Sequence, residues 1–166
     1  MTSLRILAVA LALAVTAAAV AATAPKRITA EGVDGVKLGM KHKKLRERGL
    51  VGRMQGGCPL GGPDTRSAKL RRPLRGIVNY TRKRPRRARD ITIRGGATAR
   101  GVGIGDRIRD IRDAFPKARV NRSTEDTFGL TIVRVPRDGG GPMRFGVSTE
   151  TERITLIGVP YIAFCE

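Results

Sequence analysis

Aromatic residues are scarce in this 166-residue sequence: Phe, Tyr and Trp together make up 4% of it, and Trp is absent. The hydrophobic core must therefore be built from Val, Ile, Leu and Ala. Proteins that bind single-stranded nucleic acid stack the bases on aromatic side chains, and Tyr80 is the one aromatic residue near the main run of arginines. Nucleic acid, which would have to bind through its phosphates, is therefore the less favoured ligand.

Side chains suited to nucleophilic or metal chemistry are also few, with one His and two Cys. His42 lies in a lysine-rich segment, and no acidic residue is placed to orient its ring. The acidic residues are scattered, so the sequence marks no cleft with convergent titratable groups. Gly101–Gly105 lacks the glycine spacing of a dinucleotide-binding loop. We therefore expect no catalytic residue, no metal site and no cofactor.

Charged residues are missing from the first 24 positions except for Arg5, and Ile6–Val20 is an almost unbroken apolar run. Small residues follow, which is the pattern of a secretory signal peptide. A membrane anchor, the alternative, needs about 20 apolar residues. We expect residues 1–21 to be the signal peptide, with cleavage as late as residue 24 as an alternative. No cysteine lies near this site to carry a lipid, so a secreted or periplasmic (cell-envelope) protein without a transmembrane segment is predicted.

Two cysteines, Cys58 and Cys165, remain after signal removal. In an exported chain an even pair predicts a disulfide, which here would tie the Gly- and Pro-rich loop at residues 53–68 to the C-terminal end. Closing so long a loop would stabilise the fold by about 4–5 kcal/mol. The alternative is two free thiols.

The stretch from Gly101 to Pro116 predicts a glycine turn followed by an amphipathic helix. Asp106 is placed to cap the first turn, and Pro116 cannot continue the helix. The spacing of Ile108, Ile111 and Phe115 puts them on one face.

A related pattern occurs 66 residues earlier, where Gly35–Gly39 matches Gly101–Gly105 and Leu45 stands at the position of Ile111. A second echo, at an offset of 63, relates residues 90–95 to residues 153–158. Together they predict a tandem repeat within one compact domain. The first repeat would span residues 25–95 and the second residues 96–166.

The helix of the first repeat is expected to be the weaker one. Met40 stands where the second repeat has Asp106, and Lys41, Lys43 and Lys44 crowd the first turn. Positive charge at that end opposes the helix dipole. Gly49 is expected to end the helix.

Five segments have the alternating or β-branched pattern of strands: Leu74–Thr81, Asp90–Arg94, Thr127–Val135, Met143–Ser148 and Arg153–Val159. The basic run Arg82–Arg89 would form a hairpin loop between the first two. A short helical segment followed by antiparallel strands, twice over, predicts an α+β fold with the helices packed on one face of the sheet.

This order resembles the tandem-repeat fold of the β-lactamase-inhibitory proteins, whose single-repeat relatives include small outer-membrane assembly lipoproteins. The likeness is carried by Gly35–Gly39 with Leu45, by Gly101–Phe115 and by the strand echoes. It implies a sheet of eight or so strands, with helices on one face and binding by the other. This chain has one cysteine pair where the inhibitors have more, and no aromatic-rich surface. Both departures speak against a β-lactamase as the partner.

Basic charge is concentrated in the first repeat. Residues 26–100 contain 22 Lys/Arg and 5 Asp/Glu, a balance of +17, whereas residues 101–166 have a balance of +1. A general bias toward arginine, the alternative explanation, would load both halves alike, so a partner with phosphates or carboxylates is predicted. The candidate anion-binding residues are Lys41, Lys43, Lys44, Arg82, Lys83, Arg84, Arg86, Arg87 and Arg89.

The sequence thus predicts an exported, non-enzymatic binding module that contacts an acidic partner through its basic first repeat. The partner would be an acidic protein or an envelope polyanion. A polyanion-binding envelope protein and an inhibitor of a secreted enzyme are the alternatives.

Overall fold

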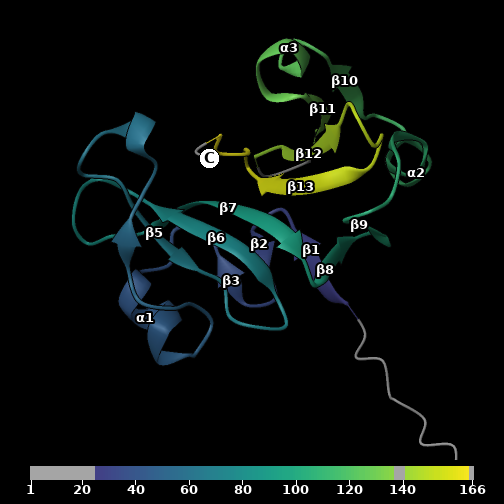
Figure 1. Cartoon of the computed structure of the whole chain (residues 1–166). Helices are drawn as coiled ribbons and strands as arrows, with labels where there is room; N and C mark the ends of the chain where they lie inside the picture. Colours follow the sequence, from purple (N-terminus) through teal and green to yellow (C-terminus); the bar gives the residue numbers. More distant parts are fainter. Residues whose placement is uncertain (1–24, 137–140, 165–166) are drawn as a thin grey trace, which may run out of the picture.

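The computed structural model describes residues 25–136 and 141–164, and these are mostly β: 44% lie in strands and 14% in helices (Figure 1). The strands of the first half are β1 (Lys26–Thr29), β2 (Gly32–Val33), β3 (Val36–Lys37), β4 (Gln55–Gly56), β5 (Arg66–Lys69), β6 (Arg75–Tyr80) and β7 (Ala88–Gly95). Those of the second half are β8 (Ala97–Ala99), β9 (Val102–Gly103), β10 (Arg119–Asn121), β11 (Leu130–Val135), β12 (Met143–Ser148) and β13 (Ile154–Val159). The helices are α1 (His42–Glu47), α2 (Ile108–Ala114) and α3 (Glu125–Phe128), with a 3-10 turn, η1, at Pro59–Gly61.

The strands form two sheets. The larger sheet has eight antiparallel strands in the order β10-β11-β12-β13-β7-β6-β5-β4, so its two middle strands are the last strands of the two halves. The smaller sheet has the order β3-β2-β1-β8-β9 and contains one parallel pair, β1 with β8. The strands predicted at residues 74–81, 90–94, 143–148 and 153–159 are confirmed with small shifts of their ends. The one predicted at 127–135 begins later, because α3 occupies its first residues.

The expected α+β class is wrong, because the helices are too short to cover a sheet. α1 has six residues and α2 has seven, and each contributes one fully buried side chain, Leu45 and Ile111. The small sheet covers the large one instead: Val33 and Val36 of the small sheet share one core cluster with Ile91 of the large sheet. The glycine segments Gly35–Gly39 and Gly101–Gly105, predicted as turns, belong to the hairpins β2–β3 and β8–β9, and these build the second layer.

The same backbone contacts occur twice, 66 residues apart. The N–H of Gly39 donates to the carbonyl of Ala88 at 2.7 Å, and the N–H of Gly105 donates to Ile154 at 2.8 Å. An arginine side chain adds a second hydrogen bond at each contact. Arg87 Nη1 donates to the Gly39 carbonyl at 3.0 Å, and Arg153 Nη1 donates to the Gly105 carbonyl at 2.7 Å. The two halves of the described chain therefore use one local design.

This offset also holds where β7 and β13 meet. Ile93 pairs with Ile157, and Ile91 pairs with Val159. Residues 91 and 157 are equivalent at an offset of 66, and so are residues 93 and 159. The two pairs are therefore repeat equivalents of each other. The two halves are thus related by a pseudo-two-fold axis through the pair Thr92 and Gly158. The sequence echo at an offset of 63 aligned the wrong residues, since the offset is 66 both at Ala88 and Ile154 and along the pairing of β7 with β13.

The capping residue of α2 also differs from the expectation. The N-cap position is Arg107, and the Asp110 carboxylate accepts a hydrogen bond of 2.7 Å from the Arg107 N–H. Asp106 instead accepts from the N–H of Gly103, also at 2.7 Å, and so holds the preceding turn. In α1 no side chain caps the first turn and no acidic residue lies in it, as the sequence indicated. Gly49, with φ of 68°, follows Arg48, the C-cap residue of α1.

We expect Asp110→Ala to lower the free energy of unfolding by about 1 kcal/mol, because it leaves the Arg107 N–H without its acceptor. Chemical denaturation at neutral pH measures this loss. The matched control is Asp113→Ala, which removes a carboxylate from the same helix outside its first turn. Equal losses from the two variants would show that the cap contributes nothing specific.

The second face of the large sheet is crossed by residues 160–164. Tyr161 lies beside Asp90, which is fully buried on β7 and accepts 2.7 Å from Asn79 Nδ2 and 3.0 Å from Arg89 Nε. Burial raises the pKa of Tyr161 to about 12, and the charge of Asp90 and the hydrogen bond to it add to this, while Arg89 opposes it. Burial likewise raises the pKa of Tyr80, on the core face, well above its ordinary value.

Two expectations fall outside the described residues. The predicted signal peptide, residues 1–21, and Cys165 both lie there, so neither export nor the pairing of Cys58 with Cys165 is confirmed. Cys58 is not a free thiol, and its Sγ lies 3.9 Å from the carbonyl oxygen of Phe164. No helix in these residues has the length and apolar character needed to cross a membrane.

Both tyrosines of the chain should ionise above their ordinary pKa of 10 in the folded protein. An acid whose folded-state pKa is raised stabilises the fold below its unfolded pKa and loses that contribution as pH rises. We therefore expect unfolding free energy to fall as pH rises above about 10. Absorbance at 295 nm tests the assignment directly: a folded-state tyrosine titrating near 10 would contradict it, and Tyr161→Phe should remove the earlier of the two transitions.

Candidate anion-binding site

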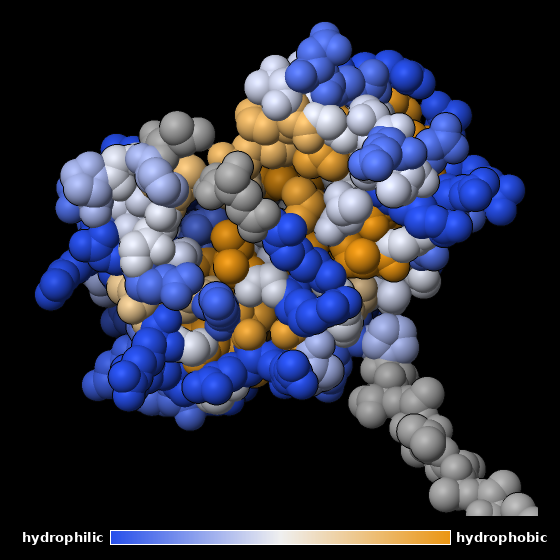
Figure 2. All heavy atoms as spheres, in the orientation of Figure 1, coloured by the Kyte–Doolittle hydropathy of each residue, from blue (hydrophilic) through white to orange (hydrophobic). Residues whose placement is uncertain are grey.

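The start of α1 and the loop between β6 and β7 lie side by side. Lys41 forms an antiparallel bridge with Arg87, and the N–H of His42 donates to the carbonyl of Arg86 at 3.0 Å. The two groups of candidate residues, separate in the sequence, therefore belong to one region. Figure 2 shows hydrophilic residues gathered at the lower left of the molecule, where α1 lies in Figure 1.

Arg86 is half-buried and holds the loop together. Its Nη1 donates to the carbonyls of Asp64 at 3.1 Å and Thr81 at 2.8 Å, and also to the carbonyl of Arg82. Carbonyl oxygens satisfied in this way would otherwise be left without a donor in a tight loop. Arg86 is therefore a structural residue of the loop.

Three further candidates are also engaged by the protein. Arg87 donates to the Gly39 carbonyl, and Arg82 Nη2 donates to the carbonyl of Gly61 at 2.7 Å. Arg89 pairs with the buried Asp90 and lies 5.6 Å from the centre of the Tyr161 ring. These contacts use backbone carbonyls from loops, which a sequence pattern does not reveal.

Eight of the nine candidates are exposed, and five of these donate no side-chain hydrogen bond within the described part of the chain. We call these five residues the basic edge: Lys41, Lys43, Lys44, Lys83 and Arg84. Lys43 has one contact, 3.9 Å from a carboxylate oxygen of Glu47, with 87% of its side chain exposed. Exposed pairs of this kind contribute little and leave the charge available.

The equivalent region of the second half has the opposite charge. The loop between β6 and β7, residues 81–87, contains five basic residues and no acidic one. The loop between β12 and β13, residues 149–153, contains Glu150, Glu152 and one basic residue, Arg153. Because Arg87 and Arg153 make the same bond, this one cation is required by the fold in both halves. Arg86 also holds the loop of the first half, whereas Lys83 and Arg84 make no side-chain contact of this kind among the described residues.

A second basic feature, not foreseen as a site, crosses the outer strands of the second half. Arg119, Arg134 and Arg144 lie directly opposite one another on β10, β11 and β12. Like charges facing each other across strands are unfavourable, and no ion pair to these three is found in the described part of the chain. The alternation around Arg134 in β11 could have indicated which face it occupies.

Arg86→Gln should lower the free energy of unfolding by about 2 kcal/mol, because bonds from a charged donor to three carbonyls are lost. Arg84→Gln removes the same charge two residues away and should change stability by less than about 0.5 kcal/mol. Thermal or chemical denaturation measures both. Similar values for the two variants would contradict the structural role of Arg86.

No group of three or more His, Cys, Asp or Glu that could hold a metal ion occurs in residues 25–136 and 141–164. Comparisons with known proteins add no family: no family model, no curated protein and no solved structure matches the chain. The resemblance to the β-lactamase-inhibitory proteins therefore stays a prediction.

Proposed function

We propose that this protein is an exported, non-catalytic binding module that contacts an acidic macromolecule through the basic edge. Export rests on the sequence of residues 1–24. The binding role rests on the difference between the two halves: positions that are equivalent in the fold are strongly basic in one half and acidic or mixed in the other. A charge that the fold does not need, gathered on one surface, is expected where an oppositely charged partner binds.

Lys44 gives the sharpest local support. It occupies the third position of α1, and its equivalent in α2 is Asp110, whose carboxylate caps that helix. Helix stability favours an acid here, both as a cap and in the field of the helix dipole. A lysine at this position is unfavourable for α1 but adds to the basic edge.

The test uses the predicted mature chain, residues 22–166, with polyphosphate and poly-L-glutamate as probes of the two kinds of acidic ligand. The variant Lys43→Gln/Lys83→Gln/Arg84→Gln should weaken binding and reduce the slope of log K against log salt by about 2–3, because each lost contact no longer releases counterions. Stability should change little, since these side chains are exposed.

The matched control is Arg109→Gln/Arg112→Gln/Arg122→Gln, which removes three charges from the second half; Arg109 is the repeat equivalent of Lys43. It should retain most of the affinity. Arg134 and Arg144 are unsuitable as controls because they form part of the arginine row on the sheet. Equal losses from the two triple variants would mean diffuse attraction by net charge and would overturn the proposal.

Lys44→Asp should move stability and binding in opposite directions. It restores the cap found in α2 and should raise the free energy of unfolding by about 0.5–1 kcal/mol. It should also weaken binding to the same probes, because it replaces a cation of the basic edge with an anion. Denaturation and the salt titration measure the two effects. A variant that is more stable and binds equally well would exclude Lys44 from the site.

A further inference from the structure

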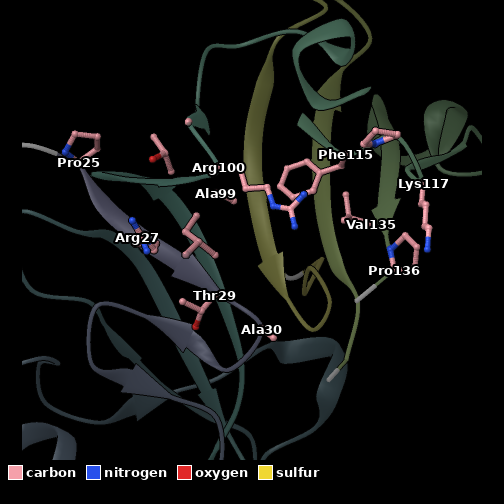
Figure 3. Close-up of a pocket in the computed structure, with 14 residues that line it drawn as sticks. Pro25, Arg27, Thr29, Ala30, Ala99, Arg100, Phe115, Lys117, Val135 and Pro136 are labelled. Carbon is pink, nitrogen blue, oxygen red and sulfur yellow. The ribbon is translucent and has the colours of Figure 1, made fainter. Parts of the chain in front are cut away.

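A second candidate site, separate from the basic edge, is a cavity of about 1040 Å³ between the small sheet and the far ends of α2 and β11 (Figure 3). Residues from β1, from the β8–β9 turn, from the end of α2 and from the end of β11 line it. The volume is at the upper end of the range for small-molecule sites. Such pockets usually combine apolar walls with a few polar groups that fix the ligand.

Among the described residues, the charged side chains that line this cavity are all cations, Arg27, Arg100 and Lys117, and none is acidic. No ion pair involving any of the three is found among the described residues. Arg100 Nη1 donates to the carbonyl of Ala114 at 3.2 Å, which leaves most of the five guanidinium donors available. The cavity is therefore electrically suited to an anion.

The walls between these cations are apolar. Ile28, Phe115 and Val135 are buried core residues that also line the cavity. Arg100 lies over the Phe115 ring at 5.2 Å from its centre, and Figure 3 shows the two side chains together in the middle of the cavity. This contact fixes the guanidinium above an apolar surface. A ligand here would meet positive charge and hydrocarbon at the same time.

The backbone at Arg100 supports a role beyond the fold. Arg100 has a φ of 50° in the β8–β9 turn, a conformation that Asn, Asp and Gly adopt most readily. The equivalent residue of the β2–β3 turn is Asp34, with a φ of 40°, and it pairs with Lys26 at 3.3 Å. The second half thus has an arginine where the turn itself favours an acid or an amide.

We propose that this cavity binds an organic anion, with a carboxylate or phosphate head and an apolar body. Arg27, Arg100 and Lys117 would bind the head, and the apolar body would lie against Phe115 and its neighbours. This site does not depend on the basic edge, and it differs from it in taking a small amphiphilic molecule.

The test is calorimetric titration of the chain from residue 22 onward with four ten-carbon probes, each below its micelle concentration. Decanoate and decyl phosphate carry the proposed head groups, whereas decanol and decyltrimethylammonium carry neutral and cationic ones. We expect one or both anions to bind at least about tenfold more tightly than the other two. The two anionic probes distinguish a carboxylate ligand from a phosphate ligand. Equal affinity for all four probes, or no binding of either anion, would overturn the proposal.

Arg100→Asn separates binding from folding. Asn suits the turn better than Arg, so the thermal midpoint should stay the same or rise, while affinity for the preferred anion should fall about tenfold. Arg53→Asn, which changes an exposed arginine outside both the cavity lining and the basic edge, should leave that affinity unchanged. Unchanged affinity in Arg100→Asn, or an equal loss in both variants, would show that the cavity is not the binding site.

Discussion

The antiparallel pairing of β7 with β13 is the contact on which the rest of this structure depends. It joins two four-stranded units into one eight-stranded sheet, and its side chains Ile91, Ile93, Ile157 and Val159 are all fully buried. Gly158, at the pseudo-two-fold axis, has no room for a side chain, because a Cβ there would lie 2.5 Å from the carbonyl carbon of Tyr161. The chain therefore turns back over its own central strand only with glycine at this position. Without this pairing each half would expose the apolar face of its last strand.

Because the fold is duplicated, each residue of one half can be compared with the equivalent residue of the other half. Where both halves have the same residue making the same bond, as with Arg87 and Arg153, the fold requires it. Where equivalent positions differ in charge, as in the loops at 81–87 and 149–153, the fold tolerates either sign. This comparison marks Arg87 as a residue that the fold requires, and the contacts of Arg82, Arg86 and Arg89 set those three apart as well. Five candidate side chains without such contacts remain. Net charge alone overstated the site, because a guanidinium that is already bound to the protein still counts as a cation.

The sequence was informative where β-branched and aromatic residues alternate with polar or small ones over a whole strand. That is why β6, β7, β12 and β13 were located from single segments, although both faces of β7 and β13 are largely buried. It was misleading where structure depends on a few residues: β2, β3 and β9 have two residues each, too short for any periodicity. Asp34-Gly35 is a recognised hairpin signal and could have indicated the first of these turns. The capping residue of α2 was also misassigned. Asp106 and Asp110 both follow the turn, and the backbone geometry decides which of them caps the helix. Arg86 donates to three carbonyls, and one of these, at Asp64, is 22 residues away in the sequence. Such contacts between loops could not be predicted from the sequence.

Lys44 and Arg100 are both cations at positions where the other half of the fold has an acid. In the first half a lysine stands where the second half has the capping Asp110, and in the second half an arginine stands where the first half has the turn residue Asp34. Local stability favours the acid at both positions, in one case through a cap and the helix dipole and in the other through the turn conformation. Each cation thus costs the fold a little and faces solvent or a cavity rather than a protein anion. A chain whose excess charge reflected composition alone would place its cations where the fold is indifferent to them. Cations at positions where the fold favours an acid therefore support the two binding sites proposed above.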